Sequence, residues 1–120
     1  MATEKPNKKP GVALVIGSGG VKCAAALGIL KAFEEEGIGL DLLVGCSGGS
    51  MYSAGIALGH SVDRLREMTM AFWTPELMAN YTANLKAATE GTIRFDERSG
   101  LVDDQFVMQA LTKAFGEQTT

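Results

Sequence analysis

The sequence predicts an α/β fold in which helices flank a parallel sheet. Two apolar runs, residues 11–16 and 40–44, are short and rich in Val, Leu and Ile, as buried parallel strands are. Each run leads through a glycine-rich turn into a segment with helical character. A strand–helix–strand order at this spacing is typical of a right-handed crossover. The two glycine turns are therefore expected at the same edge of the sheet, beyond the carboxyl ends of its strands.

The first helix is expected over residues 24–36. Leu27, Leu30 and Phe33 recur at helical spacing, and Gly37 stands where a left-handed residue commonly ends a helix. The turn before this helix, residues 17–22, reads Gly-Ser-Gly-Gly-Val-Lys. Backbone N–H groups in such a turn can bind an oxyanion if a nucleophile lies beside them.

The second turn, residues 45–49, reads Gly-Cys-Ser-Gly-Gly and precedes a helix expected over residues 50–58. This G-x-S-x-G pattern between a strand and a helix indicates a nucleophile elbow, which lifts the hydroxyl of Ser47 above the sheet. Gly45 and Gly49 let neighbouring backbone approach because they carry no Cβ. The alternative is a turn of small residues that only packs the strand against the helix.

Two glycine turns also suggest nucleotide binding, but the details disagree with it. A dinucleotide fingerprint needs G-x-G-x-x-G, and Lys22 stands where the third glycine would be. A P-loop needs Ser or Thr after its lysine, whereas Cys23 follows Lys22. The net charge of −3 provides no basic field for nucleic acid. We therefore expect neither a nucleotide cofactor nor a nucleic-acid partner.

Together these segments resemble the opening of a patatin-like phospholipase domain. The likeness rests on residues 17–22, 27–30, 35–38 and 41–49, and Gly-Leu-Val-Asp at residues 100–103 resembles a later family segment. The resemblance implies an α/β-hydrolase-related three-layer sandwich that is incomplete in this chain. It also implies a serine acyl hydrolase whose substrate is a lipid or another carboxyl ester.

By this resemblance Ser47 is the catalytic nucleophile, and Gly19, Gly20, Val21 and Lys22 form the oxyanion hole. The family pairs its serine with an aspartate in an Asp-Gly segment. This chain contains no Asp-Gly pair, so the aspartate of the Ser–Asp dyad is expected outside the chain. The chain alone should then hydrolyse esters poorly. The alternative function is that of a non-catalytic fragment or pseudoenzyme acting as an interaction module.

No local residue is expected to replace that aspartate. His60, the single histidine, lies thirteen positions after Ser47, which is about 20 Å along a helix and beyond any hydrogen bond. We expect His60 near a helix C-terminus instead. Asp103 and Asp104 precede a helical stretch, where capping its N-terminus is the more frequent use of an aspartate.

The sequence departs from the family at two cysteines. Cys23 stands where the family usually has glycine, and Cys46 replaces a frequent threonine before the nucleophile. Because a donated backbone N–H does not depend on the side chain, Cys23→Gly should be tolerated. Two small buried thiols are the favoured interpretation, with a redox-sensitive contact as the alternative. One histidine and two cysteines give no metal-ligand spacing, so no metal is expected.

The remaining segments are less informative. Residues 1–10 predict a flexible N-terminal tail without a signal-peptide core, and residues 11–120 the N-terminal part of the acyl hydrolase domain. Residues 62–70 predict an amphipathic helix and residues 92–95 a short strand. The apolar residues around Pro75 suit either a core segment, which is favoured, or a lipid-binding flap. No run can span a membrane, so we expect a cytoplasmic protein, with peripheral membrane contact through the flap as an alternative.

Overall fold

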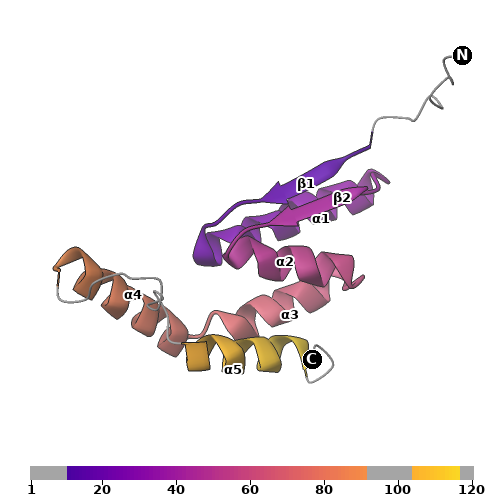
Figure 1. The fold of residues 1–120 in the computed structure, drawn as a ribbon. Helices are drawn as coiled ribbons and strands as arrows, with labels where there is room; N and C mark the ends of the chain where they lie inside the picture. The colour runs from indigo at the N-terminus through magenta and orange to yellow at the C-terminus, as the bar shows by residue number, and fades with distance from the viewer. Residues whose placement is uncertain (1–10, 92–103, 117–120) are drawn as a thin grey trace, which may run out of the picture. The chain divides into compact units, whose positions relative to one another are not determined.

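The computed structural model describes residues 11–91 and 104–116. The predicted tail at residues 1–10, the strand at 92–95 and the segment 100–103, with Asp103, lie outside the described residues. The chain divides into two compact units, Met1–Leu65 and Arg66–Thr120. In chain order the elements are β1 (Ala13–Ile16), a 3-10 helix η1 (Gly20–Ala25), α1 (Ala26–Glu35), β2 (Leu42–Gly45), α2 (Gly48–Ala57), α3 (Val62–Phe72), α4 (Pro75–Thr89) and α5 (Asp104–Phe115) (Figure 1).

Strands β1 and β2 form a parallel two-stranded sheet, which confirms the prediction from the two apolar runs. Leu14 and Ile16 share one face of β1 and are buried, whereas Val15 on the other face is 67% exposed. Leu42 and Val44 of β2 are exposed as well. Among the described residues one face of the sheet is therefore buried and the other is exposed. This α/β arrangement fits a three-layer sandwich that is incomplete, as expected.

Asp41 fixes the start of the sheet. Its carboxylate accepts a hydrogen bond of 2.8 Å from the N–H of Val12, and its own N–H donates to the Val12 carbonyl, also at 2.8 Å. Gly11 passes so close that a Cβ there would lie 2.8 Å from Asp41 Oδ2. This paired contact sets the register in which Ala13 faces Leu42.

The first helix differs from its prediction at the start and agrees at the end. The chain enters it through η1, whose first turn is closed by the Lys22 N–H and the Gly19 carbonyl at 3.1 Å, so the α-helix begins only at Ala26. At the other end Gly37 has a φ of 67°, and the N–H of Ile38 donates to the carbonyl of Phe33 at 2.8 Å. That is a Schellman motif, which satisfies the last carbonyls of the helix.

Helix α2 contacts both strands and packs most closely on β2. It begins at Gly48, two residues earlier than predicted, because the turn before it is very tight. It ends in a second Schellman motif, in which Gly59 has a φ of 78° and the N–H of His60 donates to the carbonyl of Gly55 at 3.1 Å. His60 thus follows the helix end, close to the place that the sequence predicted.

The apolar residues on either side of Pro75 belong to the second unit. Helix α4 begins at Pro75, and Thr74 caps it by accepting the N–H of Leu77 at 3.2 Å. Phe72 and Leu77 are buried, and the rings of Phe72 and Trp73 meet edge to face with centroids 4.9 Å apart. Burial of these side chains favours the core interpretation of the segment, and the lipid-binding flap stays a prediction.

Candidate active site

Ser47 lies in the tight turn between β2 and α2, where its side chain is exposed. Its backbone has φ 53° and ψ −125°, and no other non-glycine residue in the described ranges has a positive φ. A residue with a side chain in such a region carries about 1–3 kcal/mol of strain. The N–H groups of Gly49 and Ser50 donate to the carbonyls of Cys46 and Ser47, each at 2.9 Å, and close the turn.

The glycines of this turn rest directly on the first glycine turn. A Cβ on Gly48 would lie 2.8 Å from the carbonyl oxygen of Gly20 and 3.2 Å from its nitrogen. A Cβ on Gly49 would overlap the carbonyl oxygen of Ile16 and lie 2.8 Å from that of Gly17. No side chain fits at either position, so the two turns meet backbone to backbone. They share one edge of the sheet, as the crossover rule predicted.

Gly45, the last residue of β2, is required for a similar reason. A Cβ there would lie 2.6 Å from Ser53 Oγ, 2.7 Å from the Gly49 carbonyl oxygen and 2.7 Å from Ser50 Cα. These close approaches show that the end of β2 packs against helix α2, at the first helical turn and at the middle of that helix. At both predicted elbow glycines, Gly45 and Gly49, neighbouring atoms therefore already fill the space that a side chain would need.

The first glycine turn presents unpaired N–H groups beside this contact. Gly20 has a φ of 55°, and the side chains of Val21 and Lys22 are exposed. Among the described residues no hydrogen bond is made by the amides of Gly20, Val21 or Gly48. The sequence analysis did not assign Gly48, although the residue after the nucleophile commonly supplies such an amide in an elbow. Free amides at two adjoining turns can stabilise an anionic oxygen.

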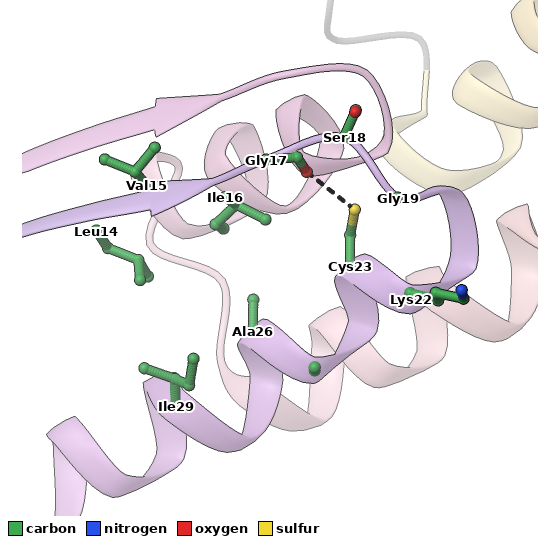
Figure 2. Close-up of a pocket in the computed structure, with 11 residues that line it drawn as sticks. Leu14, Val15, Ile16, Gly17, Ser18, Gly19, Lys22, Cys23, Ala26 and Ile29 are labelled. Carbon is green, nitrogen blue, oxygen red and sulfur yellow. Dashed lines mark hydrogen bonds between the residues drawn. The ribbon is translucent and has the colours of Figure 1, made fainter.

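Cys23 and Cys46 differ in their surroundings, although both are free thiols. Cys23 is buried, and its thiol donates a hydrogen bond of 3.2 Å to the carbonyl oxygen of Gly17 (Figure 2). Burial raises the pKa of Cys23, its backbone hydrogen bond lowers it, and the nearby Cys46 raises it further. Cys46 is exposed, so the prediction of two buried thiols is wrong for Cys46. It follows β2 on the same alternation as the exposed Leu42 and Val44.

A groove of about 300 Å³ runs along β1 to the first glycine turn (Figure 2). Ile29 of α1 and Leu14 of β1 line one part of it, and Lys22 stands beside the turn. Ser47 is not one of the lining residues. The groove therefore adjoins the candidate oxyanion loop without containing the nucleophile.

The described residues add no helix-capping partner for Ser47 and no cluster of metal ligands. The Ser47 hydroxyl makes no capping hydrogen bond, and Asp104 begins α5 in the second unit. Within residues 11–91 and 104–116, no three His, Cys, Asp or Glu side chains gather as metal ligands. Over the same ranges, each helix is too short or too polar to cross a bilayer.

Comparisons with known proteins show which proteins this chain resembles. A family model described as patatin-like phospholipase matches residues 14–120. Patatin-like phospholipase domain-containing protein 6 from Mus musculus and from Homo sapiens is 41% identical over 56 residues, which are 47% of this chain and 4% of each relative. Lysophospholipase NTE1 of Mycosarcoma maydis is 35% identical over 74 residues, 62% of this chain and 4% of that protein.

The matched segments thus span a small fraction of these relatives' length. No solved structure matches the chain. The family model, in contrast, covers both glycine turns, the sheet and the helices that follow them. The chain therefore belongs to the patatin-like phospholipase family.

Proposed function

We propose that this chain carries the nucleophile and the oxyanion hole of a serine acyl hydrolase that acts on lipids or other carboxyl esters. One observation carries the proposal: Ser47 is exposed on a strained elbow that rests on a turn with free amides. A strained backbone at a surface serine is typical of functional sites, because the fold must hold it against its preference. The relatives are named a phospholipase and a lysophospholipase, which favours a lipid ester.

In this mechanism Ser47 Oγ attacks the carbonyl carbon of the ester. The new C–O bond converts the carbonyl oxygen into an oxyanion, which accepts hydrogen bonds from the amides of Gly48 and of Gly19, Gly20 and Val21. The serine proton passes to the aspartate of a Ser–Asp dyad and then to the departing alcohol. Water hydrolyses the acyl-serine in a second step. The positive N-terminal end of α2 points toward the developing negative charge.

The proposed dyad divides the chemistry between this chain and a residue outside it. The support is the absence of any Asp-Gly pair in the sequence; in the described part of the chain the Ser47 side chain also makes no capping hydrogen bond. Residues 11–120 then form the N-terminal part of the hydrolase domain. Lys22, exposed in the first glycine turn, adds a positive charge beside the amides. A lipid substrate also implies work at a membrane surface, which makes the protein peripheral to that membrane.

A fluorophosphonate probe tests the nucleophile. The purified chain is incubated with excess probe, and the modified residue is located by mass spectrometry. We expect slow stoichiometric modification of Ser47, because an oxyanion hole retains part of its effect without the base. Ser50→Ala is the matched control, since Ser50 is an exposed serine three residues later on α2. Modification that persists in Ser47→Ala, or that is equally fast in urea, would overturn the proposal.

The second candidate is a non-catalytic interaction module. The open face of the sheet favours it, because Val15, Leu42 and Val44 are large apolar side chains that are 67%, 57% and 44% exposed. The probe experiment separates the two functions. A module without catalytic history needs no reactive serine, so it would show modification no faster at Ser47 than at Ser50.

A further inference from the structure

Cys23 makes contacts that the sequence alone did not suggest. The residue is 7% exposed, and its thiol points toward the first glycine turn, where it donates to the carbonyl oxygen of Gly17 at 3.2 Å (Figure 2). The sulfur also lies near Gly19, where it would be in ordinary van der Waals contact, at 3.5 Å, with a Cβ added to that glycine. One side chain therefore binds Gly17 and lies beside Gly19, the two glycines that flank Ser18. A glycine at position 23 would lose the hydrogen bond to Gly17.

The Gly17 carbonyl that Cys23 holds is also a support of the elbow. A Cβ on Gly49 would lie 2.8 Å from this same oxygen. The adjacent carbonyl, that of Ile16, accepts the N–H of Cys46 at 3.0 Å. The thiol thus binds the point where the first glycine turn and the elbow meet. Glycine backbone is conformationally permissive because it carries no Cβ. A hydrogen bond from another residue therefore restricts the conformation of this glycine turn.

We propose that Cys23 is a positioning residue for the oxyanion loop, in which its thiol orients the Gly17 peptide and thereby the amides that follow it. The inference rests on the proposed function, since it assigns a role to a loop next to Ser47. The thiol must be protonated to donate, and burial, which raises the pKa of Cys23, favours that form. The contacts therefore reverse the expectation that Cys23→Gly is tolerated.

The test measures acylation of Ser47 by the fluorophosphonate at saturating and at limiting probe concentration. Cys23→Ala should lower the saturated rate about fivefold, which is the effect of one weak hydrogen bond, and leave the probe's half-saturation concentration unchanged. Cys23→Ser keeps a donor on the same carbon and should restore most of the rate. Lys31→Ala is the control, because Lys31 is an exposed residue of α1 that pairs with Glu35 at 3.8 Å, away from both glycine turns, and it should keep the wild-type rate.

Hydrogen–deuterium exchange gives a second measurement that does not depend on the chemistry. Amides of residues 18–21 should exchange faster in Cys23→Ala than in the wild type and slow again in Cys23→Ser. If Ser47 of the wild type is never modified, the proposed function fails, and exchange alone still decides whether Cys23 holds the loop. Unchanged exchange in Cys23→Ala would overturn the inference. So would a lower melting temperature with an unchanged saturated rate, because that result means a purely structural role.

Discussion

Gly49→Ala is the substitution for which the structure gives the sharpest expectation. Gly49 is the second residue of α2, so its backbone is helical and tolerates alanine. The obstacle is steric: the new Cβ would overlap the carbonyl oxygen of Ile16 and lie 2.8 Å from that of Gly17. Both obstacles are backbone atoms of β1 and the turn after it, which cannot rotate away as a side chain can. The elbow and the end of β1 must therefore move apart.

The cost follows from two destabilising terms and one that partly offsets them. Inserting a methyl group into closely packed backbone costs about 1–3 kcal/mol. Separating the turns also stretches the 3.0 Å hydrogen bond from the Cys46 N–H to the Ile16 carbonyl, which is worth about 1 kcal/mol. Alanine favours a helix over glycine, which stabilises the folded chain by about 0.5–1 kcal/mol. Gly49→Ala should therefore lower the free energy of unfolding by about 1–3 kcal/mol.

Gly28→Ala is the matched control, because Gly28 lies within α1 and a Cβ there has no atom within 4 Å. It should raise the free energy of unfolding by about 0.5–1 kcal/mol. Urea unfolding of the full chain, followed by far-ultraviolet circular dichroism, measures both variants. If Gly49→Ala and Gly28→Ala have the same unfolding free energy, the backbone contact between the two turns does not exist as described.

Four further predictions concern the site and its supports. Ser47→Ala should abolish acylation by the fluorophosphonate, and Ser47→Gly should be more stable than Ser47→Ala by about 1 kcal/mol in urea unfolding, because glycine relieves the positive φ. Proline at position 19 cannot adopt the native φ of 172°, so Gly19→Pro should slow acylation about a hundredfold. Lys22→Ala should slow acylation less. A fully active Gly19→Pro with an inactive Lys22→Ala would assign the effect to the lysine charge. Ser53→Ala should not destabilise the chain to thermal unfolding, because Ser53 Oγ is buried without a hydrogen-bond partner in the described residues. Asp41→Ala should destabilise it by about 1 kcal/mol, through loss of the 2.8 Å bond between strands, and an unchanged melting temperature would show that this bond is dispensable.

The sequence predicted what depends on local pattern. Short continuous apolar runs located both strands, and the order of strand, turn and helix placed the two glycine turns at one edge. The positions of Gly37 and Ser47 followed from helix-ending and elbow patterns, and the structure places them accordingly. Each of these features is set by a few consecutive residues, so a single sequence contains enough information for it.

Features set by contacts between distant segments were not predicted. Helix α1 begins later than expected because η1 tightens its entry, and α2 begins earlier because Ser47 adopts a turn that no periodicity reveals. Cys46 is exposed because one face of the sheet has no covering layer among the described residues. The bond from Cys23 to Gly17 spans a turn whose shape depends on the elbow. None of these features leaves a pattern in composition or spacing.

The packing of the two turns explains how the strain at Ser47 can persist. A positive φ at a serine relaxes if the surrounding backbone can shift, so neighbours that cannot yield must hold it. Gly48 and Gly49 supply such neighbours, because they press against backbone atoms of the first turn and of β1. The same contacts keep the free amides of that turn beside the serine. Substitutions that loosen the contact between the two glycine turns should therefore relieve the strain at Ser47 and lower its reactivity together. The unfolding free energy of Ser47→Gly measures the strain, and the acylation rate of Gly49→Ala measures the reactivity that the same contact supports.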